Sequence, residues 1–160
     1  GETRRAKARS PQNSTKWVGR VSSGRPIYVD LLVCPLTKSG RSRCATVRRA
    51  IVDTGSELTI IPESKARSAG LQVDGSPTPA IRSMSGHTVR SRKLRAMVAL
   101  APRGRWKKAR ATATTIHITE DPPGSGVVEV LLGQDYLADA RCTVDAASRT
   151  VECHPKRGSR

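Results

Sequence analysis

The chain alternates short apolar stretches with polar ones in a pattern typical of β-strands. The apolar stretches are rich in Val, Ile, Leu and Thr, and clusters of Gly, Pro, Ser and Asp separate them. β-branched side chains fit a pleated, half-buried surface, whereas Gly and Pro mark the turns between strands. We therefore predict an all-β protein, whose expected strands span 25–34, 44–53, 57–62, 87–101, 108–119 and 127–133.

The segments between and after these strands predict hairpins and one short helix. The basic loops 35–43 and 102–106 fit the ends of hairpins. After Gly133 the sequence QDYLADA predicts one or two helical turns, and residues 141–153 predict a closing hairpin.

The length of 160 residues suits one domain with tails. Residues 1–16 are polar and charged without apolar periodicity, which predicts a disordered basic N-terminal arm. We expect the domain to occupy 17–153 and a basic C-terminal tail to occupy 154–160.

The chain is strongly basic, because 29 Lys and Arg against 13 Asp and Glu give a formal charge of +16. Such a charge attracts phosphate backbones, so we expect non-specific nucleic-acid contact through a basic surface, although charge runs also occur on plain solvated loops. Two Trp and two Tyr are too few for base-stacking platforms. No stretch approaches the ~20 apolar residues of a membrane span. We predict a soluble intracellular protein of the cytoplasm, without membrane contact.

One carboxylate lies between two blocks of aliphatic residues. The run AIVDTGSELTIIP, residues 50–62, places Asp53 and a Gly-Ser pair between these blocks. Burying an unpaired ionised group is costly, so Asp53 is either a satisfied turn residue or a catalytic group. The pattern predicts a strand–turn–strand junction that holds this carboxylate at a rigid turn.

Two further segments follow the Asp53 run in a recognisable order. Residues 80–92, AIRSMSGHTVRSR, indicate a hairpin with Ser85-Gly86 at its tip, and residues 128–140, VEVLLGQDYLADA, indicate an apolar strand ending in Gly before a short helix. The trio resembles the retropepsin family of retroviral-type aspartic proteases over residues 25–153. The resemblance implies an all-β retropepsin-like acid protease fold: a closed or partly open β-barrel with a flap hairpin and one short C-terminal helix, active as a homodimer.

The resemblance also implies roles for individual residues. Asp53 would be catalytic, Thr54 would hydrogen-bond across the dimer, and Gly55 would bring its backbone amide close to the carboxylates. Ser56 could donate a hydrogen bond to ionised Asp53 and favour its charged form. The remaining assigned residues are the supporting Leu132 and Gly133 and the substrate-covering flap residues Met84, Ser85, Gly86, His87 and Thr88.

Metal-free peptide hydrolysis needs one carboxylate that takes a proton from water and a second, protonated one that polarises the scissile carbonyl. Two other aspartates do not fit this role, because Asp74 lacks the apolar pair and the Thr that flank Asp53, and Asp135 belongs to the supporting segment. The second carboxylate should therefore be Asp53 of another copy across a twofold axis, as the family implies. We predict an aspartic endopeptidase without cofactors that cleaves a retroelement polyprotein or a cellular protein. The alternative is a non-catalytic retropepsin-like module that dimerises and binds peptides or nucleic acid.

The cysteines lack the Cys-x-x-Cys spacing of a zinc site, so we expect no metal. Cys34 with Cys44 and Cys142 with Cys153 flank hairpin loops and could form disulfides, whereas an intracellular location predicts four free thiols. His117 alternates with isoleucines in a predicted strand, which favours a surface or hydrogen-bonded histidine over a metal ligand.

Overall fold

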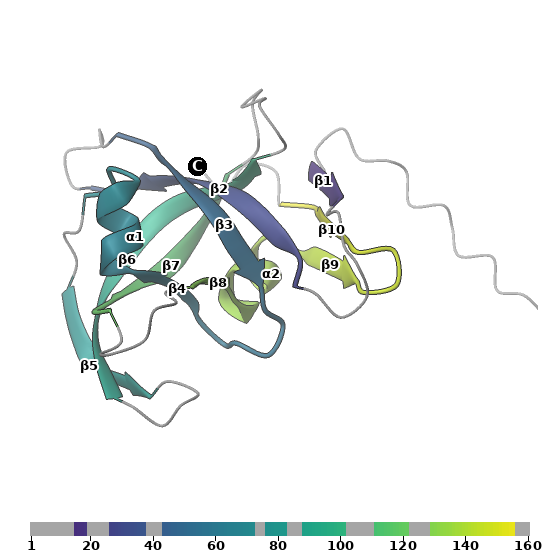
Figure 1. Cartoon of the computed structure of the whole chain (residues 1–160). Coiled ribbons are helices and arrows are strands. Elements are labelled where there is room, and N and C mark those ends of the chain that lie inside the picture. Colours follow the sequence, from purple (N-terminus) through teal and green to yellow (C-terminus); the bar gives the residue numbers. More distant parts are fainter. Residues whose placement is uncertain are drawn as a thin grey trace, which may run out of the picture.

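The structure is a computed structural model, and it describes residues 15–18, 26–37, 43–72, 76–82, 88–101, 111–121 and 129–155. These residues form ten strands and two short helices (Figure 1). The strands are β1 (Thr15–Val18), β2 (Tyr28–Pro35), β3 (Ala45–Val52), β4 (Thr59–Pro62), β5 (Ser76–Arg82), β6 (Thr88–Ala101), β7 (Thr112–Thr119), β8 (Val130–Leu132), β9 (Cys142–Asp145) and β10 (Thr150–Cys153); the helices are α1 (Glu63–Ser68) and α2 (Gln134–Asp139).

Six strands close into a barrel. The larger sheet has the order β2-β3-β8-β4-β7-β6-β5, and β2 also pairs with β6, which joins the two ends of the six-stranded part. Strand β5 pairs only with the first half of β6 and extends the sheet beyond the barrel (Figure 1). A smaller sheet of β1, β10 and β9 lies beside the barrel, next to α2.

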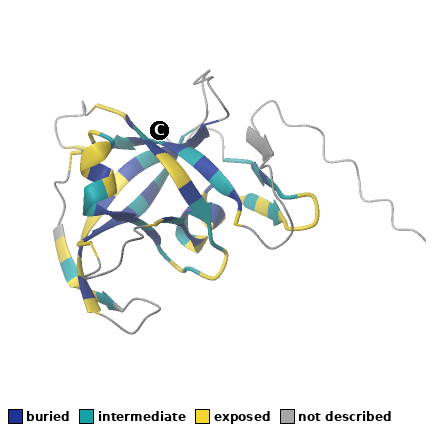
Figure 2. Cartoon of the chain, in the orientation of Figure 1, coloured by how far each residue is buried: buried dark blue, intermediate teal, exposed yellow. Residues whose placement is uncertain are grey.

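The alternating pattern of the strands places the core inside the barrel. In β2, Val29, Leu31 and Val33 are buried while the residues between them are partly exposed. Figure 2 shows the same alternation along the barrel strands. Fully burying one such side chain stabilises a fold by about 1.5–3 kcal/mol. Helix α2 adds Tyr136 and Leu137 to this core, so the helix is anchored by its own apolar residues.

The all-β class is confirmed, and each predicted strand overlaps an observed one. The helix after Gly133 is α2, and the closing hairpin is β9 with β10. The two basic loops do join antiparallel pairs, β2 with β3 and β6 with β7. Strand β1 starts at Thr15, so it includes the last two residues of the predicted arm; the rest of that arm and residues 156–160 lie outside the described part of the chain.

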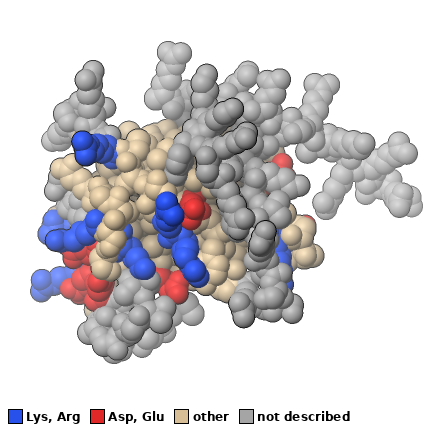
Figure 3. All heavy atoms as spheres, turned by 45° about the horizontal axis from the view of Figure 1, so that its top comes forward, with Lys and Arg blue, Asp and Glu red and all other residues tan. Residues whose placement is uncertain are grey.

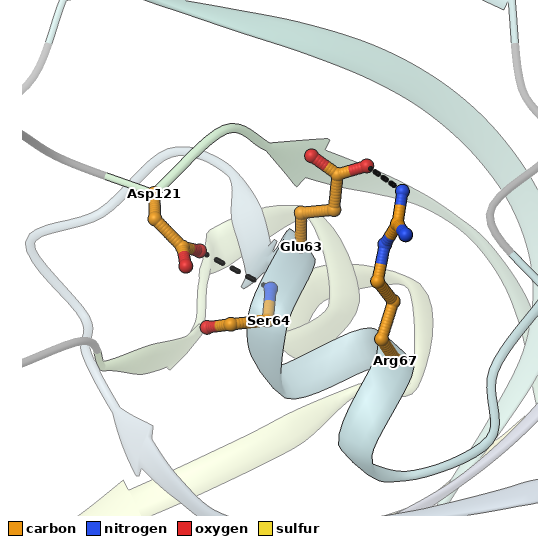
Figure 4. A network of polar contacts seen from close by, with 4 residues as sticks. All are labelled: Glu63, Ser64, Arg67 and Asp121. Carbon is orange, nitrogen blue, oxygen red and sulfur yellow. Dashed lines mark hydrogen bonds and ion pairs between the residues drawn. The ribbon is translucent and has the colours of Figure 1, made fainter.

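The expected short C-terminal helix is α2, and the structure adds a second helix, α1, directly after β4. Its sequence, ESKARS, buries only Ala66 and therefore lacks the apolar periodicity that predicts a helix. A tertiary contact holds it instead, because the backbone N–H of Ser64 donates to Asp121 Oδ1 at 3.2 Å (Figure 4). Within the helix, Arg67 pairs with Glu63 at 2.7 Å. The ion pair is exposed, so we expect it to contribute only about 0.3–0.5 kcal/mol.

Strand β5 contains Pro77 and Pro79, which is why the apolar pattern indicates only its end as part of a hairpin. Proline is tolerated here because β5 is an edge strand that pairs on one side. The missing N–H groups also make this edge a poor template for pairing with another chain.

Two disulfides join facing strands of hairpins. Cys34 is bonded to Cys44 between β2 and β3, and Cys142 is bonded to Cys153 between β9 and β10. The local pairing is confirmed, and the expectation of four free thiols is wrong, since no cysteine of the chain is free. Antiparallel register explains the pairing, because Cys142 and Cys153 are direct cross-strand partners.

Charged side chains of both signs share the face shown in Figure 3. Among the residues drawn there in colour, Lys and Arg lie beside Asp and Glu and do not form a continuous basic patch. The expected nucleic-acid contact therefore gains no support from this face and stays a prediction. Neither helix of the described residues is long and apolar enough to cross a membrane.

Candidate active site

Asp53 lies directly after β3, in a turn held by backbone hydrogen bonds. Its N–H donates to the carbonyl of Leu132 at 3.0 Å, and its own carbonyl accepts from the N–H of Ser56 at 3.1 Å. The carboxylate is half-buried, and its Oδ1 accepts a hydrogen bond from the N–H of Gly55 at 2.9 Å. The turn therefore presents a carboxylate that is held by a backbone N–H donor, and it lies at the molecular surface beside exposed Thr54.

Gly55 brings its amide close to the carboxylate, which is the position that the family resemblance implies. A Cβ atom at this position would lie 3.2 Å from Asp53 Oδ1, which is tight for a carbon and would push against the carboxylate. Glycine fits here because the backbone itself makes the contact.

Ser56 does not bind the carboxylate of Asp53, and this corrects the expected role of its hydroxyl. The Oγ atom donates to the carbonyl of Leu58 at 2.7 Å instead. Serine hydroxyls often bond to a backbone group two residues away in turns, and that local partner is the one Ser56 uses. The side chain therefore shapes the turn and has no direct effect on the charge of Asp53.

The segment that enters α2 clamps the far side of the turn. The N–H of Gln134 donates to the carbonyl of Ser56 at 2.8 Å, and the N–H of Asp135 donates to the carbonyl of Glu57 at 3.1 Å. The side-chain amide of Gln134 donates to the carbonyl of Thr54 at 2.7 Å. Leu132 and Gly133, which the resemblance assigns a supporting role, lie directly before Gln134 in this segment, and sequence reasoning missed the contact of Gln134.

Asp135 ties the strand after the turn to α2. Its Oδ2 accepts from the N–H of Thr59 at 3.0 Å, and its Oδ1 accepts from the Thr59 hydroxyl at 2.5 Å and from the N–H of Tyr136 at 2.7 Å. The Thr59 hydroxyl in turn accepts from the N–H of Gly133 at 3.1 Å. Thr59 is fully buried. A polar residue within the aliphatic run LTII is the signal that could have indicated this network.

An apolar row lies beside Asp53 on the outer side of the barrel. Ile51, Leu131 and Ile60 are registered neighbours on β3, β8 and β4. All three are partly exposed. On β4 and β8, the residues on either side of Ile60 and of Leu131 are buried. Asp53 follows Ile51 by two residues and comes directly after the end of β3, so the row leads into the Asp53 turn.

His117 continues this row, because it is the register partner of Ile60 on one side and of Lys93 on the other. It is 6% exposed, and its Nδ1 has no hydrogen-bond partner within the described residues. Burial lowers the pKa of His117, nearby Asp135 opposes that shift, and Lys93 adds to it. Burial therefore disfavours the charged form of the imidazole, and the structure corrects the expectation that His117 could lie at the surface.

The expected flap begins as predicted, with antiparallel β5 and β6. The last pairs before its tip are Ile81 with Val89 and Arg82 with Thr88. Thr88 is exposed at the start of β6. The predicted tip residues Met84, Ser85, Gly86 and His87 lie outside the described residues.

Solved structures with a similar fold are retroviral and retropepsin-like proteases. EIAV protease in complex with the inhibitor HBY-793 is 13% identical, with a TM-score of 0.52 over 79% of this chain and 98% of that chain. A retropepsin-like aspartic protease from Rickettsia conorii is 12% identical, with a TM-score of 0.49 over 88% of this chain and 90% of that chain. The retroviral protease-like domain of Ddi1 from Leishmania major is 13% identical, with a TM-score of 0.44 over 74% of this chain and 81% of that chain.

No curated protein sequence matches the chain significantly. The family described as aspartyl protease, however, matches residues 39–136. That match runs from before β3, through the Asp53 turn and the flap strands, to the start of α2, and it covers more than half of the chain. With its retropepsin-like fold, the chain therefore belongs to the aspartyl protease family.

Proposed function

We propose that the chain is an aspartic endopeptidase that works as a homodimer. The observation that carries this proposal is the Asp53 carboxylate, held at the surface by the N–H of Gly55 on a turn that α2 clamps from behind. A binding module would not need a carboxylate fixed in this way. The family match supports the same chemistry, because it includes the Asp53 turn.

In this mechanism two Asp53 carboxyls face each other across a twofold axis. Two carboxyls in close contact share one proton, because both cannot ionise cheaply. The ionised carboxylate takes a proton from water while the protonated one donates to the scissile carbonyl oxygen, so that hydroxide adds to the carbonyl carbon. A proton then passes to the amide nitrogen, the C–N bond breaks, and the dyad returns to its starting state. Thr54, exposed beside Asp53, would bridge the two copies.

The apolar row of Ile51, Leu131 and Ile60 supports a preference for apolar side chains next to the cleaved bond. The row leads into the Asp53 turn, so a bound extended peptide would place alternate side chains against it. The natural substrate in this proposal is a retroelement polyprotein or a cellular protein with an exposed apolar segment.

Activity per chain should rise with protein concentration until dimers saturate, because an interface-built site is absent from monomers. The measurement is peptide cleavage across a dilution series, with and without a pepstatin-type inhibitor, beside sedimentation of the same samples. Activity strictly proportional to protein at dilutions that contain only monomer would contradict the dimer.

We further propose that the chain matures in an oxidising compartment and not in the cytoplasm predicted from sequence. The support is the pairing of all four cysteines, since structural disulfides are rare where thiols are kept reduced.

The two disulfides join cysteines that are 10 and 11 residues apart in sequence. Closing a loop of this length should contribute about 2–3 kcal/mol for each bond, so reducing both should destabilise the protein by roughly 5 kcal/mol. The melting temperature should fall by on the order of 10–20 °C, measured with and without reductant. A variant with both Cys34→Ser and Cys44→Ser serves as control, because its response to reductant should be about half as large. Four alkylatable thiols in protein isolated from its source would contradict the proposed compartment.

A further inference from the structure

The peptide group between Thr54 and Gly55 is held at both of its ends. Its N–H, on Gly55, donates to Asp53 Oδ1 at 2.9 Å. Its C=O, on Thr54, accepts from Gln134 Nε2 at 2.7 Å. One rigid peptide plane therefore connects the side chain of Gln134 to the carboxylate of Asp53.

We propose that Gln134 is a positioning residue, which sets the orientation of this peptide plane and through it the orientation of the Asp53 carboxylate. The catalytic consequence rests on the proposed peptidase function. The claim that Gln134 orients the peptide plane concerns a single chain, and it can be tested without measuring activity.

The peptide needs such a restraint because its surroundings resist rotation poorly. Thr54 and Gly55 are both exposed, and glycine accepts backbone conformations of either sign. If the peptide turned over, the Thr54 carbonyl would face the carboxylate in place of the Gly55 N–H, replacing an attraction with a repulsion. A hydrogen bond to the carbonyl opposes that rotation, and it also strengthens the N–H of the same peptide as a donor.

Gln134 is fixed well enough to act as this restraint. Its backbone N–H donates to the carbonyl of Ser56 at 2.8 Å, so the residue binds the turn at two points. Gly133 lies directly before it, and a Cβ there would meet the Leu58 carbonyl oxygen at 2.2 Å. The close approach of α2 to the turn, which only glycine permits, brings the Gln134 amide within reach of Thr54.

The chemistry of the side chain is specific. Its amide donates a hydrogen at every pH, whereas a carboxyl in its place would donate only when protonated, near pH 4.3 or below for an ordinary Glu. Methionine has a similar length and no donor. The acidic residues of the turn and of α2, namely Asp53, Glu57, Asp135 and Asp139, would favour the protonated form of an introduced carboxyl.

The test compares Gln134→Met and Gln134→Glu with wild type, and uses Ala138→Gln, at an exposed position of α2, as the matched control. The first measurement is the Gly55 amide resonance in ¹⁵N-labelled protein, assigned with the Asp53→Asn variant. We expect Gln134→Met to shift or broaden this resonance and Ala138→Gln to leave it in place. The second measurement is kcat and KM against pH.

For Gln134→Met we expect kcat to fall about tenfold with little change in KM, because a tenfold loss is the size expected for one lost hydrogen bond. The ratio of its kcat to that of wild type should not change with pH. For Gln134→Glu we expect the ratio of its kcat to that of wild type to rise as the pH falls toward 4, because the protonated carboxyl then donates to the Thr54 carbonyl. An unchanged Gly55 resonance in Gln134→Met, or parallel pH profiles for the two variants, would overturn the proposal. If wild type cleaves nothing, the peptidase function fails, and the resonance alone decides the role of Gln134.

Discussion

Replacing Asp53 with Asn should leave a folded dimer that hydrolyses peptides about 10³-fold more slowly than wild type. Asparagine has nearly the shape of aspartate, and its Oδ1 can still accept the N–H of Gly55, which now lies 2.9 Å from the carboxylate. The amide cannot take a proton from water or share one with its symmetry mate. The measurement is kcat at matched dimer occupancy, with binding of a pepstatin-type inhibitor as a separate readout of the intact cleft.

Asp145→Asn provides the matched control for this loss. Asp145 also accepts backbone N–H groups, from Ala147 and Ser148, but it is the last residue of β9, at the turn to β10. Removing its charge should leave cleavage at the wild-type rate. If Asp53→Asn also cleaves peptides at the wild-type rate, the catalytic assignment is wrong and the non-catalytic dimerisation module becomes the better account.

Replacing Gly133 with Ala should destabilise the protein by about 3–5 kcal/mol or prevent it from folding. The added Cβ would lie 2.2 Å from the carbonyl oxygen of Leu58 and 2.5 Å from its carbonyl carbon. Both are backbone atoms, so no side-chain rotation relieves the clash. Relief requires α2 to move away from the turn, which breaks the hydrogen bonds from Gly133 to Thr59 and from Gln134 to Ser56. Unfolding in denaturant measures the change.

Gly70→Ala separates this steric effect from the general effect of replacing a glycine. Gly70 has a φ of +76° and nothing within 4 Å of the added Cβ, so its substitution meets backbone strain alone and should cost roughly 1–2 kcal/mol. Gly133 instead has an ordinary φ of −100°, so its cost comes from space alone. Equal unfolding midpoints for the two variants would show that the approach of α2 to the turn is looser than the structure has it.

Local patterns were sufficient to predict the barrel strands and the position of the turn, but not β1 or most of β5. Residues such as Val29, Leu31 and Val33 face one side of β2 because side chains alternate along any strand, wherever that strand is placed. The same locality holds for the helix after Gly133 and for the disulfides, whose cysteines face each other across hairpins. It holds as well for the Asp53 turn, where the carboxylate and its Gly55 donor are two residues apart.

The features that the sequence left open depend on atoms far apart along the chain. The amide of Gln134 meets the Thr54 carbonyl across 80 residues, and the carboxylate of Asp135 meets Thr59 across 76. Nothing near Gln134 or Asp135 in sequence indicates those partners, because a hydrogen bond across the fold exists only once the barrel has brought its two ends together. Sequence alone therefore determined which residue could do the chemistry, and the tertiary structure decided what holds it, because close packing of α2 against the turn selects each contact.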